Sequence, residues 1–362
     1  MINDSTPRKD GFRMPAEFEE QKQVFLLWPE RKDVWHHEAK SAQKVFTEVA
    51  HAIARFEEVT VGVSEEQYED AMRKLGPNVR TVIMPHDDVW TRDVGPTFVI
   101  NDKGDTRGID WDFNAWGGID EGAYYPWDKD GSVAASIITL ENVESYRTEN
   151  FVLEGGSIHV DGEGTLLTTK ECLLNKNRNP HLTQEEIEEY LRAYLNVEKI
   201  IWLNQGLFND ETDGHIDNIC CFARPGEVIL SWTDDESSPN YEICRSAYEI
   251  LNNSIDAKGR TIKVYKLELP QPIFVTNEED DGILQSADAT RFSTDEPLPA
   301  SYVNFLFCNH SIIMPIFNDP KDELAIKTLK EIFPDREIVT IYSREIILGG
   351  GNIHCISQQQ PK

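Results

Sequence analysis

Apolar side chains recur every three or four residues in several stretches of the chain, a spacing that predicts amphipathic helices. The predicted helices span residues 41–56, 68–75, 187–195, 240–252 and 321–333. Short runs rich in β-branched and aromatic residues predict strands between them. These runs are 58–63, 79–84, 97–101, 158–160, 165–169, 198–203, 219–223, 227–232, 261–267, 303–307 and 311–317. Interleaved helices and strands indicate an α/β fold. No linker divides the chain, so we expect a single domain over residues 1–362.

Two of these helices carry start signals. Ser64 stands three residues before Gln67, which is the spacing of a capping box. Thr183 and Glu186 repeat that spacing before the helix at 187–195. Both signals support the helices that the apolar pattern predicts.

Five segments share one form, in which a polar motif leads into a short strand, a turn and a second strand. They are WTRDVGPTFVINDKGD, VLEGGSIHVDGEGTLLTT, DGHIDNICCFARPGEVILS, ASYVNFLFCNHSIIMPIF and REIILGGGNIHCISQ. Asp93, Glu154 and His215 lead the first three segments, at two equal spacings of 61 residues. Self-similarity at a long period predicts a repeated α/β unit stacked around an axis, as in propeller-like or barrel folds.

Acidic side chains outnumber basic ones by 64 to 35, which gives a net charge of −29. A nucleic-acid binder needs clustered Lys and Arg to contact phosphates. The charge therefore argues against that class and favours a protein that attracts small cations. No apolar run approaches the ~18 residues of a membrane-spanning helix, and the polar N-terminus lacks a secretory signal. We expect a cytoplasmic protein that has neither a membrane nor a nucleic-acid partner.

The cysteines contain no C-x-x-C pair, which argues against a disulfide framework or a structural zinc site. They are Cys172, Cys220, Cys221, Cys244, Cys308 and Cys355. The first five lie in apolar or helical runs and are interpreted as buried thiols of the core. Cys355 differs because it follows a glycine run, in which Gly350 and Gly351 allow a ligand to approach the backbone closely. Cys355 is therefore the candidate nucleophile.

If the starts of the repeated strands face a common centre, Asp93, Glu154, His215, Asp217 and Cys355 converge there. One residue separates His215 from Asp217, so on a strand both would project to the same face. His215 is the candidate acid/base beside the thiol. Carboxylates raise the pKa of a cysteine and hinder its attack unless the substrate itself is positively charged. A planar guanidinium satisfies this condition, because carboxylates bind it bidentately.

Aromatic residues are dense at 111–127, and aromatic faces bind cations. Trp90 and Trp116 are the candidates for substrate contact. Three other interpretations of the constellation are a His-x-Asp metal pair, a Cys-His peptidase and a non-catalytic binder of polyamines or guanidines. The remaining histidines show no ligand spacing, and three carboxylates would serve no purpose beside a neutral amide. We expect no metal and no cofactor.

The same residues resemble the agmatine deiminase family, within the guanidine-modifying superfamily. The matching motifs run nearly from end to end: FRMPAEFE (12–19), LLWP (26–29), WTRDVGPTF (90–98), DFNAWGG (112–118), FVLEGGSIHVDGEGT (151–165), NPHLT (179–183), DGHIDN (213–218), RPGEV (224–228) and GGGNIHCISQQQP (349–361). The region 270–300 resembles the family least. Its acidic part, 277–300, is interpreted as a surface insertion.

The resemblance implies a five-unit α/β propeller of ββαβ-type units, with the active site on its central axis. It also implies a homo-oligomer, either a dimer or a tetramer. The implied reaction is hydrolysis of agmatine to N-carbamoylputrescine and ammonia, in polyamine synthesis or agmatine catabolism, without a cofactor. By position, Cys355 is the implied nucleophile, His215 the acid/base and Glu154 the carboxylate that orients the histidine. Asp93 and Asp217 are expected to clamp the guanidinium.

The residues before His215 read NDETDG and are rich in acids, which suits an amine tail better than the carboxylate of arginine. Glu211 is the candidate for that contact. Two related enzymes stay open as alternatives. One is an amidinotransferase, in which an amine resolves the covalent intermediate. The other is a deiminase that acts on another guanidine compound, such as arginine.

Overall fold

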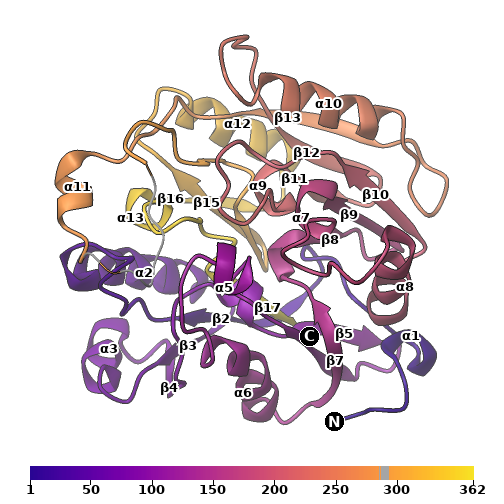
Figure 1. Ribbon diagram of the computed structural model, residues 1–362, viewed down its shortest axis with the longest axis horizontal. Coiled ribbons are helices and arrows are strands. Elements are labelled where there is room, and N and C mark those ends of the chain that lie inside the picture. The colour runs from indigo at the N-terminus through magenta and orange to yellow at the C-terminus, as the bar shows by residue number, and fades with distance from the viewer. Residues whose placement is uncertain (285, 287–292) are drawn as a thin grey trace.

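The computed structural model describes residues 1–284, 286 and 293–362 and shows a mixed α/β fold (Figure 1). Its strands are β1 (Phe12–Arg13), β2 (Gln21–Leu27), β3 (Glu58–Val63), β4 (Arg80–Ile83), β5 (Thr97–Asn101), β6 (Thr106–Asp112), β7 (Glu144–Val152), β8 (His159–Val160), β9 (Thr165–Thr169), β10 (Lys199–Leu203), β11 (Cys220–Arg224), β12 (Glu227–Trp232), β13 (Lys263–Glu268), β14 (Leu306–Cys308), β15 (Ser311–Ile316), β16 (Glu337–Tyr342) and β17 (Ser357–Pro361). Its helices are α1 (Pro7–Asp10), α2 (Lys40–Ile53), α3 (Tyr68–Leu75), α4 (Thr91–Val94), α5 (Gly118–Glu121), α6 (Val133–Leu140), α7 (Lys170–Leu173), α8 (Gln184–Leu195), α9 (Ile216–Ile219), α10 (Tyr241–Asn252), α11 (Asn277–Asp281), α12 (Asp322–Ile332) and α13 (Arg344–Ile347).

In the described part of the chain, the strands form five separate open sheets. Their orders are β1-β5-β6-β7, β8-β9-β10, β11-β12-β13, β14-β15-β16 and β17-β2-β3-β4. Every sheet contains one repeated pattern, in which two strands pair antiparallel and the second of them pairs parallel with a third. A parallel pair needs a crossover connection. A helix lies in that connection in each sheet, and Figure 1 shows these helices at the periphery of the molecule. They are α2, α6, α8, α10 and α12.

The two ends of the chain meet in one sheet. β17 pairs antiparallel with β2, so the last strand completes the sheet that the N-terminal part begins. All five residues of β17 are buried, and Gln23 Nε2 donates to Gln360 Oε1 at 2.7 Å. Gln358 Nε2 donates to the carbonyl oxygen of Pro96 at 2.6 Å. The sequence does not predict β17 because its buried side chains are glutamines, which give no apolar alternation.

The five predicted helices are confirmed as α2, α3, α8, α10 and α12, and α8 shows why the apolar spacing works. Ile187, Leu191 and Leu195 lie one turn apart and are all buried. The predicted capping box is present, since Thr183 Oγ1 accepts from Glu186 N and Glu186 Oε2 accepts from Thr183 N. The capping box and the burial of the apolar residues therefore act together to fix where α8 begins.

The acidic segment 277–300 is anchored in the fold at both of its ends. It begins with α11, whose Glu279 forms a two-point ion pair with Arg344, at 2.6 and 2.7 Å. Near the other end, Leu298 and Ala300 are buried. Residues 285 and 287–292, on which part of the predicted surface insertion falls, lie outside the described residues.

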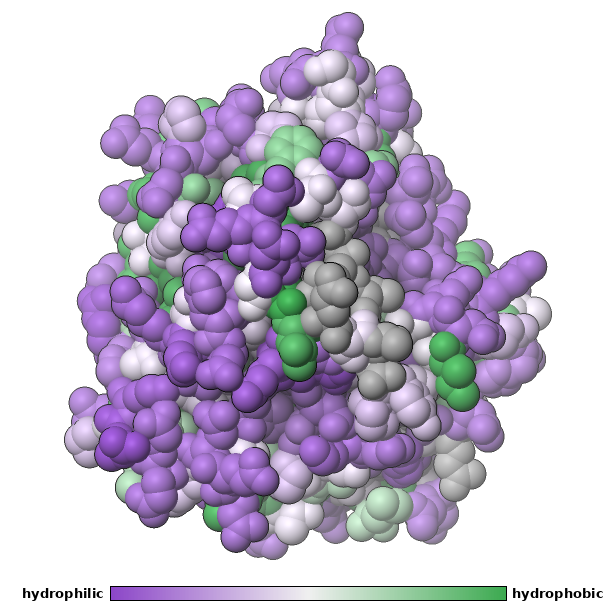
Figure 2. All heavy atoms as spheres, turned by 60° about the vertical axis from the view of Figure 1, so that its left-hand side comes forward, coloured by the Kyte–Doolittle hydropathy of each residue, from purple (hydrophilic) through white to green (hydrophobic). Residues whose placement is uncertain are grey.

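The molecular face in Figure 2 is mostly hydrophilic, and its hydrophobic side chains form only small, scattered patches. This agrees with a chain that carries 64 acidic and 35 basic residues, because most of those charges are solvated. None of the helices in the described ranges has both the length and the apolar character needed to cross a membrane.

Thr183→Ala removes the acceptor of the capping box and should lower the free energy of unfolding by about 1 kcal/mol. Chemical denaturation measures this loss. Thr328→Ala is a matched control, because Thr328 lies in the middle of α12, where alanine is the better helix former. An equal loss in both variants would contradict the capping role.

Candidate active site

Four of the predicted site residues occupy equivalent positions. Each lies a few residues before the first strand of the repeated pattern in its own sheet. Asp93 lies in α4, before β5, and Cys355 lies two residues before β17. Glu154 precedes a 3₁₀ turn before β8, and His215 precedes α9 before β11. The repeated unit thus carries one polar side chain from each of these sheets to a common centre.

The sequence suggested that His215 and Asp217 lie on a strand. In the structure His215 immediately precedes the short helix α9, and Asp217 lies within it. Gly214 has a φ of +79°, which turns the chain just before the helix and prevents an extended run. Both side chains nevertheless reach the same point. A Cβ atom placed on Gly156 would lie 2.5 Å from His215 Nδ1 and 3.0 Å from Asp217 Oδ2.

Asn304 occupies the corresponding place in the remaining sheet, two residues before β14. Its Nδ2 lies 3.1 Å from Cys355 Sγ and 2.9 Å from Asn218 Oδ1. Asn304 was not predicted as a site residue, although the segment ASYVNFLFCNHSIIMPIF that contains it has the form of the repeat. The signal was the polar residue that leads the segment's first strand.

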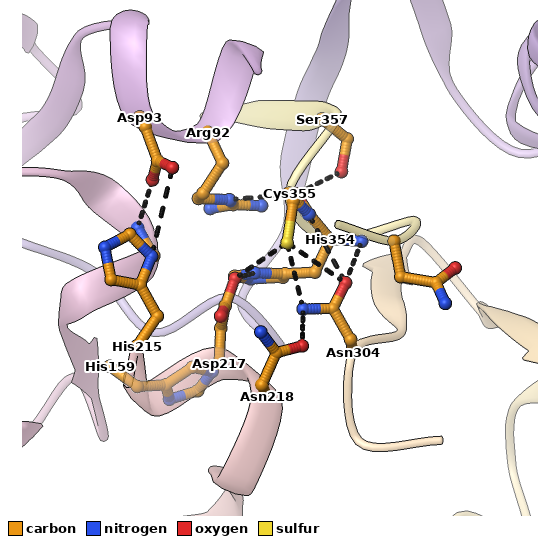
Figure 3. A network of polar contacts seen from close by, with 12 residues as sticks. Arg92, Asp93, His159, His215, Asp217, Asn218, Asn304, His354, Cys355 and Ser357 are labelled. Carbon is orange, nitrogen blue, oxygen red and sulfur yellow. Dashed lines mark hydrogen bonds and ion pairs between the residues drawn. The ribbon is translucent and has the colours of Figure 1, made fainter. Parts of the chain in front are cut away.

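The Cys355 thiol is buried between polar groups. Figure 3 shows its sulfur pointing between Asp217 and Asn304, and Sγ lies 3.5 Å from Asp217 Oδ2. Burial raises the pKa of Cys355 well above its usual range, and the Asp217 and Asp93 carboxylates raise it further. Without a ligand the sulfur is therefore held as the neutral thiol.

Asp93 faces the same centre and is fixed by two donors. Its Oδ2 accepts from Trp116 Nε1 at 3.0 Å, and its Oδ1 accepts from the backbone N–H of Gly156 at 2.9 Å. Burial raises the pKa of Asp93 to about 6, and the neighbouring carboxylates of Asp217 and Glu154 contribute to the rise. The carboxylate is thus oriented but costly to ionise until a cation arrives.

His215 lies between two carboxylates. Its Nδ1 is 3.9 Å from Asp93 Oδ2, and its Nε2 is 4.0 Å from Glu154 Oε2. Burial opposes a charge on the ring, yet Asp93, Cys172 and Glu154 together raise the pKa of His215 well above its usual range. The imidazole consequently carries a proton that it can donate to a group bound in the buried centre.

Glu154 is bound most closely by Arg178, a residue that was not predicted as part of the site. Arg178 Nε lies 2.6 Å from Glu154 Oε1, and both side chains are fully buried. One potential metal-ligating group combines Glu154 with Cys172 and His215, whose ligand atoms lie within 4.8 Å of one another. Arg178 already supplies a positive charge to this group, so the arrangement suits a carboxylate held by an ion pair beside a histidine better than a metal ion.

A pocket of about 840 Å³, counting its open mouth, leads to Cys355. The predicted contact residues all line it: Trp90, Trp116, Glu211, Gly350 and Gly351. Trp90 is fixed by Asp88, which accepts from its indole N–H at 2.9 Å. Gly351 has to be glycine, because a Cβ atom there would lie 2.9 Å from Cys355 Cβ and would also collide with the Trp90 ring.

The charge of the pocket is one-sided. Five carboxyl groups line it, and no Lys or Arg does so among the described residues. The five are Asp33, Asp88, Asp93, Glu211 and Asp280. Burial raises the pKa of Glu211 to about 7, and Asp210 adds to the rise. The pocket therefore favours a ligand that carries positive charge along its length.

The family model of the Porphyromonas-type peptidyl-arginine deiminases matches residues 13–361. The chain belongs to this family. An agmatine deiminase from Pseudomonas aeruginosa is 58% identical over 99% of this chain and 97% of its own length. This identity confirms the resemblance to agmatine deiminases that the motifs indicated.

Two solved structures extend the comparison. The agmatine deiminase of Enterococcus faecalis has a TM-score of 0.97 and 48% identity, covering 99% of this chain and 98% of that one. A cysteine-to-serine variant of the C. jejuni agmatine deiminase, with substrate bound, has a TM-score of 0.84 and 26% identity, covering 97% and 96%. The fold and the family are therefore shared over nearly the whole chain.

Gly156→Ala should lower the free energy of unfolding by about 1–3 kcal/mol, because the added methyl overpacks the space beside His215 and Asp93. Denaturant titration gives this value. Gly131→Ala is the control, since a Cβ atom there meets nothing within 4 Å, and it should change stability by no more than about 0.5 kcal/mol. Equal stability of the two variants would show that the centre is not tightly packed.

Proposed function

We propose that the protein hydrolyses agmatine to N-carbamoylputrescine and ammonia. The observation that carries this proposal is a buried thiol, Cys355, among carboxylates in an acidic pocket. A dication with a planar guanidinium at one end and an ammonium at the other matches such a pocket. The relatives from P. aeruginosa and E. faecalis, both named agmatine deiminase, support the same substrate.

Asp93 and Asp217 bind the guanidinium, which places its carbon next to the Cys355 sulfur. The positive charge of the ligand offsets the two carboxylates that raise the pKa of the thiol. The thiol therefore loses its proton to water when the substrate is bound, and it stays protonated otherwise. Trp90 and Trp116 line the pocket and exclude water from the aliphatic part of the substrate.

The thiolate of Cys355 attacks the guanidinium carbon and forms a neutral tetrahedral adduct. His215 gives a proton to one amino group, the C–N bond breaks, and ammonia leaves behind a cationic thiouronium. His215, now neutral, removes a proton from an attacking water molecule. The C–S bond then breaks and restores the thiolate. The protonated ureido product gives its extra proton to water and departs.

Glu154 orients His215 in this scheme, and Arg178 fixes Glu154 in turn through the 2.6 Å contact. Asn304 Nδ2, 3.1 Å from the sulfur, stabilises the thiolate by donating a hydrogen bond. A substrate-bound cysteine-to-serine variant of the C. jejuni enzyme is consistent with a thiol needed for turnover but not for binding.

Glu211 binds the ammonium at the other end of the substrate. It lines the pocket together with other acids and is itself partly buried. The carboxylate of arginine would have to enter the same acidic surroundings without a basic partner, so agmatine is favoured over arginine.

We infer that the five sheets are five ββαβ units arranged around one axis, which makes a five-unit α/β propeller with Cys355 near that axis. The antiparallel-then-parallel pattern common to the five sheets supports this arrangement. We also infer one domain over residues 1–362, a cytoplasmic location without nucleic-acid partners and a homo-oligomer, either a dimer or a tetramer. The net charge of −29 supports the absence of nucleic-acid binding.

Incubation with agmatine, arginine and a peptidyl-arginine, each followed for ammonia and ureido product, tests the function. Agmatine should give the highest kcat/KM, and Cys355→Ala should release no ammonia while keeping its near-UV circular dichroism. Cys244→Ala is the matched control, because Cys244 is a buried thiol of α10 and should be dispensable for turnover. Turnover by Cys355→Ala would refute the mechanism. Transfer of the amidino group to an added amine would indicate an amidinotransferase instead.

Glu211 should make agmatine binding depend on pH near neutrality. With a pKa of about 7, its carboxyl is ionised above that pH and neutral below it, so KM for agmatine should rise as pH falls from 8 to 6. In Glu211→Gln, KM should be high at every pH in this range, by roughly tenfold over the wild-type value at pH 8. An unchanged pH dependence of KM in that variant would remove Glu211 from the tail contact.

A further inference from the structure

His354 precedes Cys355 in the sequence, but its ring lies against two carboxylates and not along the pocket. Its Nδ1 lies 2.8 Å from Asp217 Oδ2. Figure 3 shows the two side chains next to each other. Its Nε2 lies 2.8 and 3.0 Å from the two carboxylate oxygens of Glu17, a residue 337 positions away in the chain. All three side chains are at least nine-tenths buried. The proposed reaction uses neither His354 nor Glu17.

This geometry determines the protonation of the ring. A carboxylate oxygen accepts hydrogen bonds, so each ring nitrogen that faces one has to carry a proton, and the ring is an imidazolium. Burial and the Arg92 guanidinium both oppose that charge, yet Glu17 and Asp217 raise the pKa of His354 above its usual range. Because both nitrogens are occupied by carboxylates, neither can exchange a proton with a ligand at Cys355.

The surrounding charges balance. Arg92 Nη1 lies 3.2 Å from Glu17 Oε1, and its Nε donates to the carbonyl oxygen of His354 at 3.3 Å. Two cations, Arg92 and His354, therefore face two anions, Glu17 and Asp217, in one buried cluster. Five other titratable groups lie beside it, namely His159, Cys221, Cys355, His215 and Asp93. Removal of one member leaves a partner charged and buried, which is costly.

Asp217 has two oxygens with different surroundings. Its Oδ2 is shared by His354 Nδ1, at 2.8 Å, and Cys355 Sγ, at 3.5 Å. Its Oδ1 is buried and has no hydrogen-bond partner within the described ranges. An unpaired buried acceptor is unfavourable unless a ligand supplies the donor. His354 thus holds the Asp217 carboxylate through Oδ2, and Oδ1 is left to accept a hydrogen bond from a ligand.

We propose that His354, held by Glu17, is a positioning residue that fixes Asp217 with Oδ2 against the Cys355 thiol and Oδ1 toward the guanidinium of the substrate. The identity of that ligand rests on the proposed function, whereas the arrangement of the three side chains rests on the distances alone. Glu17 and His354 act through Asp217 and do not touch the substrate.

His354→Gln tests the role, because glutamine is neutral and can donate to only one of the two carboxylates from a single group. Loss of the imidazolium should raise the pH midpoint of Cys355 alkylation by iodoacetamide by about 1 unit, since Asp217 stays ionised at the alkaline pH where the thiol titrates. Mass spectrometry of the Cys355 peptide measures this midpoint. With agmatine, kcat/KM should fall about 100-fold, mostly through KM, because Asp217 is misplaced.

Glu17→Gln removes one of the two carboxylates that keep His354 protonated. His354 should then lose its proton below the pH at which the thiol titrates, so the midpoint and kcat/KM should change in the same direction as in His354→Gln. The change should be smaller, because the lost anion offsets part of the lost cation. The changes in the alkylation midpoint and in kcat/KM should be no larger in the double variant than in His354→Gln, because both substitutions act through the same carboxylate, that of Asp217. His86→Gln is the matched control, since both ring nitrogens of His86 are also engaged, at 2.8 Å, but by the carbonyl oxygens of Met84 and Trp28. Its alkylation midpoint should equal that of the wild type.

An unchanged midpoint in both His354→Gln and Glu17→Gln would overturn the proposal, and so would fully additive losses in the double variant. If His354→Gln does not fold, Glu17→Gln and its midpoint decide. The alkylation measurement needs no turnover. Failure of the wild type to convert agmatine would therefore refute the proposed function and leave the test of His354 intact.

Discussion

The structure depends on the burial of like charges around a thiol. Asp93 and Asp217 lie beside Cys355, and burial raises the pKa of both the thiol and Asp93. Such a centre is unfavourable when empty, because each carboxylate loses hydration and repels the next. Two kinds of partner make it tolerable. Buried cations balance the surrounding carboxylates: His354 contacts Asp217, Arg178 pairs with Glu154 and Arg92 pairs with Glu17. A cationic ligand balances the carboxylates that face the pocket.

The five sheets explain how residues so far apart in the chain form this centre. In each sheet a short helix or turn leads into an antiparallel strand pair. Each of these connections carries one polar side chain of the centre. These are Asp93, Glu154, His215, Asn304 and Cys355. One sheet could not surround a ligand by itself, whereas the five sheets supply a thiol, an imidazole, two carboxylates and an amide. The chemistry is therefore divided among repeats whose backbones are alike.

Much of this could be predicted from the sequence, because the predicted features are local. The apolar period located five helices, and the repeated segments indicated which polar residues lead the strands. The partners that hold those residues could not be predicted in the same way. Glu17 and His354 are 337 residues apart, and Arg178 reaches Glu154 across 24 residues. Such contacts are set by the tertiary packing and leave no periodic signal. β17 was missed for another reason, since its glutamines are buried by pairing and not by hydrophobicity.

The pairing of β17 with β2 has a consequence for how the site is assembled. Cys355 lies two residues before β17, and in that sheet Ser357 pairs with Leu26. The thiol is therefore held in place only when two segments that are far apart in the chain have joined one sheet. The entropy of closing so long a loop opposes this pairing until the intervening parts have packed. The complete set of polar groups thus exists only in the fully folded protein.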